Sequence, residues 1–157
     1  MTRYLPIIGV IGAGECESTI YRLAQEVGRE IACRGAVLVC GGLGGVMEAA
    51  ARGAADAGGL TIGILPGPST RYANRYIRVP VATDMGQARN VIIVHTADVL
   101  IAISGGAGTL SEIGHALKVG KPVIGLQTLP NLEGVLYVQG AQEAVEQAFA
   151  LIDKRAR

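Results

Sequence analysis

Short runs rich in Val, Ile and Leu alternate along the chain with longer, alanine-rich segments of helical period. The apolar runs predict strands over Ile7–Ile11, Ala36–Cys40, Leu60–Leu65, Tyr76–Val81, Val99–Ile103 and Pro122–Leu126. The alanine-rich segments predict helices over Ser18–Ala32, Gly45–Ala57, Thr109–Val119 and Gln139–Ile152. This alternation is typical of βαβ units with right-handed crossovers. The sequence therefore predicts a single three-layer α/β domain over residues 1–157, with a mostly parallel central sheet.

The segment Arg89–Thr96 is the one whose pattern fits either element. Its apolar run Val91–Val94 would serve equally well in a strand, because periodicity does not decide so short a run. We predict a helix, since the strand Val99–Ile103 follows too soon for the crossover that a parallel neighbour needs.

Composition narrows the possible environment and partners. Half of the residues are apolar, but Trp is absent and Phe occurs once, so Val, Ile, Leu and Ala must form the core. The formal net charge is +1 with both signs interspersed, which disfavours partners such as nucleic acid or an anionic membrane surface. No apolar segment reaches the ~18 residues that span a bilayer. Cys16, Cys33 and Cys40 form no CxxC pair, so we expect a reduced, cytoplasmic protein.

The sequence does not predict a metal site. His95 and His115 lie far apart in the chain, with no Cys or carboxylate at ligand spacing. We expect His115 to face solvent on its helix. Lys118 and Lys121 are expected to complement the dipole at the end of the same helix.

Glycine clusters follow three predicted strands, at the edge where open parallel sheets bind ligands. The first cluster, Gly12 and Gly14, suggests a dinucleotide loop, but a GxGxxG pattern would require glycine where Glu17 stands. Glu15 and Glu17 also place negative charge at the start of the next helix, which would repel a phosphate there. We interpret this loop as a tight turn and do not expect it to bind NAD.

The second cluster contains Gly41, Gly42, Gly44 and Gly45, at the start of a predicted helix. Its backbone amides are unshielded, and no acidic residue appears before Glu48, so the helix start is open to an anion. Close packing of the helix on the strand would explain the same glycines equally well. Both interpretations remain open.

The third cluster, Gly105, Gly106 and Gly108, precedes or opens another predicted helix. Three glycines remove side chains where a phosphate could meet helix amides. Thr109 followed by Glu112 also matches the S/T-x-x-E capping box, in which both side chains bind amides of the first turn. On spacing alone, a cap explains Glu112 better than a catalytic role does.

Three stretches of the chain resemble motifs of a known superfamily. Ser104–Glu112 (SGGAGTLSE) is similar to PGGxGTxxE, Cys40–Glu48 (CGGLGGVME) to GGGxxGLMG, and Thr83–Asn90 (TDMGQARN) to TDMHxRK. These are motifs of the LONELY GUY (LOG) proteins, whose superfamily also contains the DNA-processing protein DprA and the molybdenum cofactor carrier proteins. The SGG and Arg-Asn forms resemble most closely the short bacterial relatives of the molybdenum cofactor carriers.

The resemblance implies a Rossmann-like domain that binds a phosphate-bearing heterocycle, either a nucleotide or a pterin phosphate such as the molybdenum cofactor. A binding or carrier role is our first prediction, and no further cofactor is required. The implied ligand-binding residues are Gly41, Gly42, Gly44, Gly45, Arg89, Asn90, Gly105, Gly106, Ala107, Gly108 and Thr109.

Two alternatives accompany this prediction. In a LOG-type enzyme, Arg89 and Glu112 would be the catalytic pair that cleaves the N-glycosidic bond of a nucleoside 5′-monophosphate. Arg89 could instead be an ordinary surface residue in the first turn of its helix. In the second alternative, the fold is an interaction module without a ligand. The resemblance also implies a homodimer or homotetramer.

Overall fold

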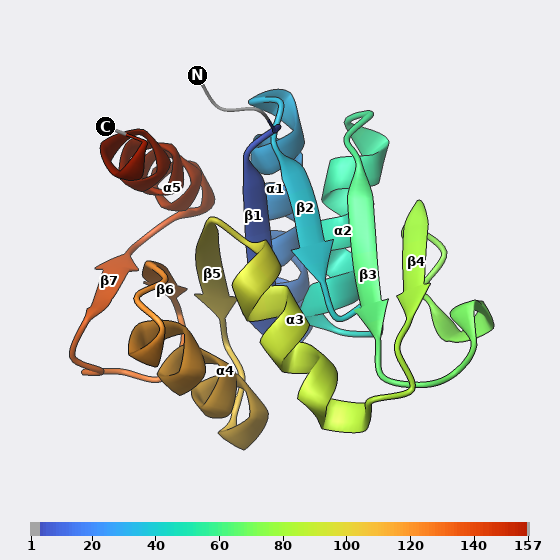
Figure 1. Cartoon of the computed structure of the whole chain (residues 1–157). Coiled ribbons are helices and arrows are strands. Elements are labelled where there is room, and N and C mark those ends of the chain that lie inside the picture. Colours follow the sequence, from blue (N-terminus) through green and yellow to red (C-terminus); the bar gives the residue numbers. More distant parts are fainter. Residues whose placement is uncertain (1–3, 157) are drawn as a thin grey trace.

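A computed structural model describes residues 4–156 and places seven strands in one parallel sheet (Figure 1). The order across the sheet is β4-β3-β2-β1-β5-β6-β7. The strands are β1 (Ile7–Gly12), β2 (Val37–Cys40), β3 (Thr61–Leu65), β4 (Val79–Ala82), β5 (Val99–Ile103), β6 (Val123–Leu126) and β7 (Val135–Val138). All six pairs of neighbouring strands are parallel, which confirms the predicted α/β class.

Helices cover both faces of the sheet. They are α1 (Ser18–Cys33), α2 (Val46–Asp56), α3 (Arg89–Thr96), α4 (Ala107–Lys118) and α5 (Ala141–Arg155), with 3-10 turns η1 (Thr70–Tyr72) and η2 (Gly86–Ala88). Helices α1, α2 and α5 pack on one face, whereas α3 and α4 pack on the other (Figure 1). The inner strand β5 is buried at every position because it has helices on both sides.

The edges of the sheet differ from the prediction. Strand β4 begins at Val79 rather than at Tyr76, because the Tyr76 carbonyl accepts a hydrogen bond from Thr61 Oγ1 and its amide donates to Asn74 Oδ1, which holds this stretch in a loop. Strand β7 was not predicted. It joins β6 through residues 127–134 without a helix, and so short a connection is unusual between parallel neighbours.

Strand β1 lies at the point where the strand order reverses. Its neighbours are β2 on one side and β5 on the other. The three glycine clusters follow these three strands and therefore meet at one edge of the sheet, the carboxyl edge. This is the position at which open α/β sheets bind ligands.

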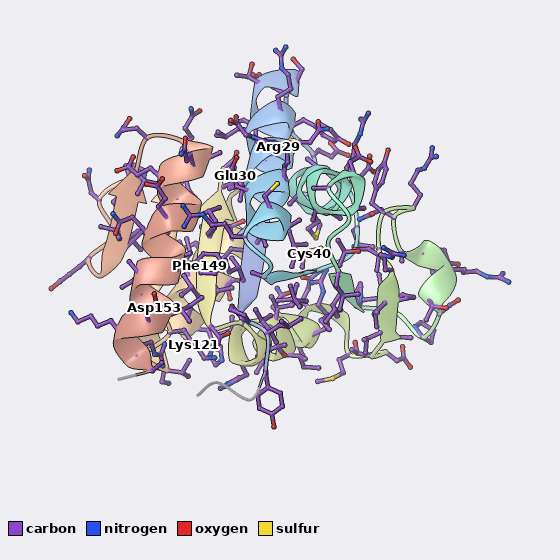
Figure 2. All side chains as sticks on the ribbon, turned by 90° about the horizontal axis from the view of Figure 1, so that it is seen from above. Arg29, Glu30, Cys40, Lys121, Phe149 and Asp153 are labelled. Carbon is purple, nitrogen blue, oxygen red and sulfur yellow. The ribbon has the colours of Figure 1, made fainter. Side chains whose placement is uncertain are left out.

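Charged side chains lie mostly at the periphery, and apolar ones fill the interior (Figure 2). Arg29 and Glu30, on the outer side of α1, form an ion pair of 2.7 Å, whereas Cys40 is fully buried. Burial raises the pKa of the Cys40 thiol to about 11, so this cysteine is an inert core residue. Among residues 4–156, no helix has the length and apolar character needed to cross a membrane.

Candidate functional site

Arg89 is the first residue of α3, and its side chain is buried beneath the carboxyl edge, with 5% of its surface exposed. Its Nε donates to the carbonyl of Ile64 at 2.8 Å, and its Nη2 donates to the carbonyl of Gly41 at 3.4 Å. Its Nη1 donates to the side-chain oxygens of Gln87 and Asn90. Burial lowers the pKa of the guanidinium, which remains a cation at neutral pH. The alternative that Arg89 is a surface residue is wrong.

Gly41 makes room for this arginine. A Cβ atom at Gly41 would lie 2.7 Å from Arg89 Nη2 and 2.6 Å from Met47 Sδ, closer than side-chain atoms approach one another. A side chain at this position would therefore push the guanidinium away from the end of β2. The glycine and the arginine act as one structural unit.

Glu112 belongs to α4 and is half-buried, facing the same region as Arg89. Burial raises the pKa of its carboxyl group to about 7, and the nearby positive charge of Arg89 opposes this shift. The two side chains line one cavity of about 250 Å³, together with Gly12, Gly41 and Asn90. The structure thus brings together the arginine and the glutamate that the sequence motifs singled out.

The predicted capping box is wrong. Helix α4 begins at Ala107, two residues earlier than predicted, and its N-cap is Gly106, with no capping hydrogen bond from a side chain. Thr109 lies inside the first turn and is buried, and its side chain packs over Gly105, which has a φ of +102°. Because Thr109 is not the N-cap, Glu112 has no cap to form and its carboxyl group is available to the cavity.

The N-terminus of α4 is open. No protein atom lies within 4 Å of a Cβ atom built on Gly106 or Gly108, and the first turn carries no acidic residue. The first amides of a helix have no partner within it and carry partial positive charge. This end of α4 can therefore receive an anion without displacing a side chain.

The N-terminus of α2 is more crowded. The amide of Val46 donates to the carbonyl of Ala13 at 2.9 Å, and a Cβ atom on Gly45 would lie 2.3 Å from the same carbonyl oxygen. Gly44 also lies close to the first glycine loop, because a Cβ atom at Gly44 would lie 3.1 Å from the carbonyl oxygen of Gly14. Packing between the two loops therefore accounts for Gly44 and Gly45. Gly42 packs in the same way, against Leu65.

A second hollow, of about 400 Å³, runs between α3 and α4, and we call it the α3–α4 groove. Gln87, Asn90 and Glu112 line both this groove and the smaller cavity, so the two are adjacent. Gly108 and His115 also line the groove. Gln87 was missed as a site residue, although it stands two positions before Arg89 in the quoted motif.

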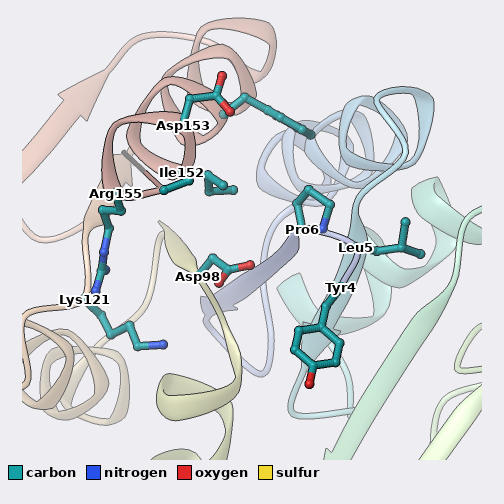
Figure 3. Close-up of a pocket in the computed structure, with 10 residues that line it drawn as sticks. Tyr4, Leu5, Pro6, Asp98, Lys121, Ile152, Asp153 and Arg155 are labelled. Carbon is teal, nitrogen blue, oxygen red and sulfur yellow. The ribbon is translucent and has the colours of Figure 1, made fainter. Parts of the chain in front are cut away.

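A separate cavity of about 470 Å³ lies at the opposite, amino edge of the sheet (Figure 3). Two of its polar groups have structural partners. Asp98 Oδ2 accepts a hydrogen bond from the Ile7 amide at 2.8 Å, and Lys121 Nζ donates to the His95 carbonyl at 3.0 Å. Lys121 also donates to the carbonyl of Ala97. It therefore caps the end of α3, not the end of α4 as the sequence suggested.

A family model described as the SLOG cluster4 family matches residues 5–153. The chain belongs to the SLOG cluster4 family. Its predicted resemblance to LOG and molybdenum cofactor carrier proteins is confirmed by individual relatives.

Two solved structures of molybdenum cofactor proteins align along nearly their whole length with this SLOG cluster4 protein. The molybdenum cofactor binding protein of Rippkaea orientalis has a TM-score of 0.91 and 39% identity, over 96% of this chain and 99% of that one. The carrier protein of Chlamydomonas reinhardtii has a TM-score of 0.85 and 37% identity, over 94% and 99%.

Sequence relatives include one protein with an enzymatic name. A protein of Archaeoglobus fulgidus is 53% identical over 91% of this chain and 94% of its own length. The cytokinin riboside 5′-monophosphate phosphoribohydrolase of Mycobacterium tuberculosis is 32% identical over 78% of this chain and 71% of its own length.

The raised pKa of Glu112 gives a prediction for stability. The usual pKa of a Glu carboxyl group is about 4.5, and that of Glu112 in the folded protein is about 7. Between these two pH values the folded protein binds more protons than the unfolded chain, so the free energy of unfolding falls as pH rises. Allowing for solvent screening at a half-buried group, we expect this fall in the free energy of unfolding to be about 1–2 kcal/mol. Glu112→Gln should therefore become progressively more stable than the wild type between pH 5 and pH 7, as measured by urea unfolding at each pH. A constant difference across this window would contradict the burial of Glu112.

Proposed function

We propose that the protein binds a phosphate-bearing heterocycle, a nucleotide or a pterin phosphate such as the molybdenum cofactor, as a binding or carrier protein. The observation that carries this proposal is the open N-terminus of α4, which lies at the reversal point of the sheet. The same helix carries Glu112, which lines a cavity together with the buried Arg89. Helix N-termini at this position are suited to phosphate.

In the proposed complex, the amides of Ala107, Gly108 and Thr109 donate hydrogen bonds to the phosphate oxygens. Arg89 already donates to four protein oxygens, so it contributes mainly a fixed positive charge rather than a free hydrogen-bonding fork. The heterocycle occupies the α3–α4 groove, whose volume of about 400 Å³ falls within the ~300–1,000 Å³ usual for ligand sites.

The share of each relative's length that this chain covers favours a carrier. The chain spans 99% of both molybdenum cofactor proteins but 71% of the phosphoribohydrolase, and its identity to the enzyme is lower. A carrier needs the phosphate site and the groove, and it needs no reacting group.

One observation favours a LOG-type phosphoribohydrolase as the second candidate. Glu112, with a pKa raised to about 7, lies beside the cationic Arg89 in a shared cavity. A carboxyl group with this pKa exists in both protonation states near neutral pH, so it could stabilise an oxocarbenium-like centre or give a proton to a leaving base. In that case, Glu112 would be the catalytic residue and Arg89 its charge partner.

The two candidates, and an interaction module without a ligand, differ in a combined binding and turnover assay. Thermal unfolding is measured with nucleoside 5′-monophosphates and with pterin phosphates, and released base is measured by chromatography. For a carrier, we expect a raised Tm without release of base, and Glu112→Gln should retain the shift. Release of base that disappears in Glu112→Gln would identify the enzyme. No Tm shift with any ligand would leave the interaction module.

The oligomeric state is a further part of the proposal. By its resemblance to LOG and carrier proteins, we propose a homodimer or homotetramer. Sedimentation equilibrium of the full chain distinguishes these states from a monomer.

A further inference from the structure

Two histidines that are distant in the sequence meet between the last turns of α3 and α4. His95 Nε2 and His115 Nε2 lie 3.3 Å apart, and the ring centres are separated by 5.3 Å. Helices α3 and α4 run side by side on one face of the sheet (Figure 1), which is how residues twenty positions apart come together. The contact is solvent-exposed, as expected for His115, but the sequence did not predict that His115 meets His95.

The spacing of this pair matches two ligands on one tetrahedral zinc ion. At Zn–N distances of about 2.0–2.1 Å, two imidazole nitrogens on a tetrahedral ion lie about 3.3–3.4 Å apart, and their ring centres lie about 5.2 Å apart. Adjacent nitrogens in a square-planar or octahedral arrangement would lie only about 2.8–3.0 Å apart at the same bond lengths. Both observed separations agree with the tetrahedral geometry.

We propose that His95 and His115 bind one Zn²⁺ ion through their Nε2 atoms, with water in the remaining positions. Within the described part of the chain, no group of three or more His, Cys, Asp or Glu side chains is placed to hold a metal, so the protein supplies two ligands. Imidazole nitrogen suits zinc, and open positions leave the ion able to accept a further group.

The ion would lie at one end of the α3–α4 groove. His115 lines this groove together with Glu112, one helical turn earlier on the same face of α4. Lys121, which follows α4, is held at the carbonyls of His95 and Ala97. The proposed zinc site is therefore separate from the phosphate site at the opposite end of α4.

The competing explanation is a hydrogen bond in which one neutral imidazole donates to the other. A linear hydrogen bond at this nitrogen separation would place the ring centres about 5.6 Å apart, farther than the 5.3 Å observed. The rings are therefore not in line with the direction that joins the two nitrogens, as is also the case for two ligands on one ion.

Zinc titration of the full chain tests the proposal. The protein is freed of any affinity tag and of metal, and Zn²⁺ is titrated by calorimetry and against a chromophoric chelator. We expect saturation at one ion per chain. His95→Ala and His115→Ala should each weaken binding by about tenfold or more, and the ¹⁵N signals of both Nε2 atoms should shift on saturation.

Cys33→Ser is the matched control, because Cys33 is an exposed thiol that could bind zinc by itself. Its substitution should leave the affinity unchanged. The proposal is overturned if zinc does not saturate, if either histidine variant binds as tightly as the wild type, or if Cys33→Ser removes the binding. Circular dichroism confirms that the variants remain folded.

Discussion

Arg89→Ala is expected to abolish ligand binding and to lower the free energy of unfolding by about 2–4 kcal/mol. The substitution removes the donors to the carbonyls of Ile64 and Gly41 and leaves a buried space between β3 and α3. It also removes the positive charge beside the proposed phosphate site. Urea unfolding gives the first quantity, and calorimetric titration of the folded fraction gives the second.

Two controls separate the causes. Arg89→Lys keeps the charge but lacks the planar fork, so it should recover part of the stability and only part of the affinity. Arg29→Ala removes an exposed arginine whose ion pair with Glu30 lies on the outer surface, and it should change the stability by less than about 1 kcal/mol. An Arg89→Ala protein as stable as Arg29→Ala would show that Arg89 does not support the carboxyl edge.

Gly108→Ala is expected to weaken ligand binding by about tenfold or more while leaving the protein folded. A Cβ atom at Gly108 meets no protein atom within 4 Å, and alanine favours a helix, so the stability should be unchanged or should rise by up to ~1 kcal/mol. Gly108 lines the α3–α4 groove, where the added methyl group would take space from the heterocycle.

Gly114→Ala is the matched substitution in the same helix. Gly114 is exposed, its Cβ position is equally free of contacts, and it lines neither the cavity nor the groove. It should give a similar change in Tm without loss of affinity. Equal affinity in the two variants would place the ligand outside the groove.

The sequence predicted those helices and strands whose limits depend on adjacent residues in the chain. The limits of α3 and β5 agree with the prediction because the short connection between them excluded a second strand. Strand β7 was missed because its connection to β6 is shorter than parallel neighbours usually require.

The site was only partly predictable, because its geometry depends on distant parts of the chain. Arg89 is held by carbonyls 25 and 48 residues away, which no local pattern reveals. The Thr-x-x-Glu spacing suggested a cap, but the glycines before Thr109 allow α4 to begin earlier and place Thr109 inside its first turn. The motif resemblance identified Arg89 and Glu112 as a pair where the local pattern did not.

The proposed phosphate site is tested most directly by backbone amide NMR of the full chain, titrated with nucleoside 5′-monophosphates and pterin phosphates and with their dephosphorylated counterparts. We expect a phosphorylated ligand to shift the amides of Ala107, Gly108 and Thr109 most, and its dephosphorylated form to bind at least about tenfold more weakly. Equal responses to both forms, shifts centred on the cavity at the amino edge, or no response to any ligand would contradict a phosphate site at the N-terminus of α4.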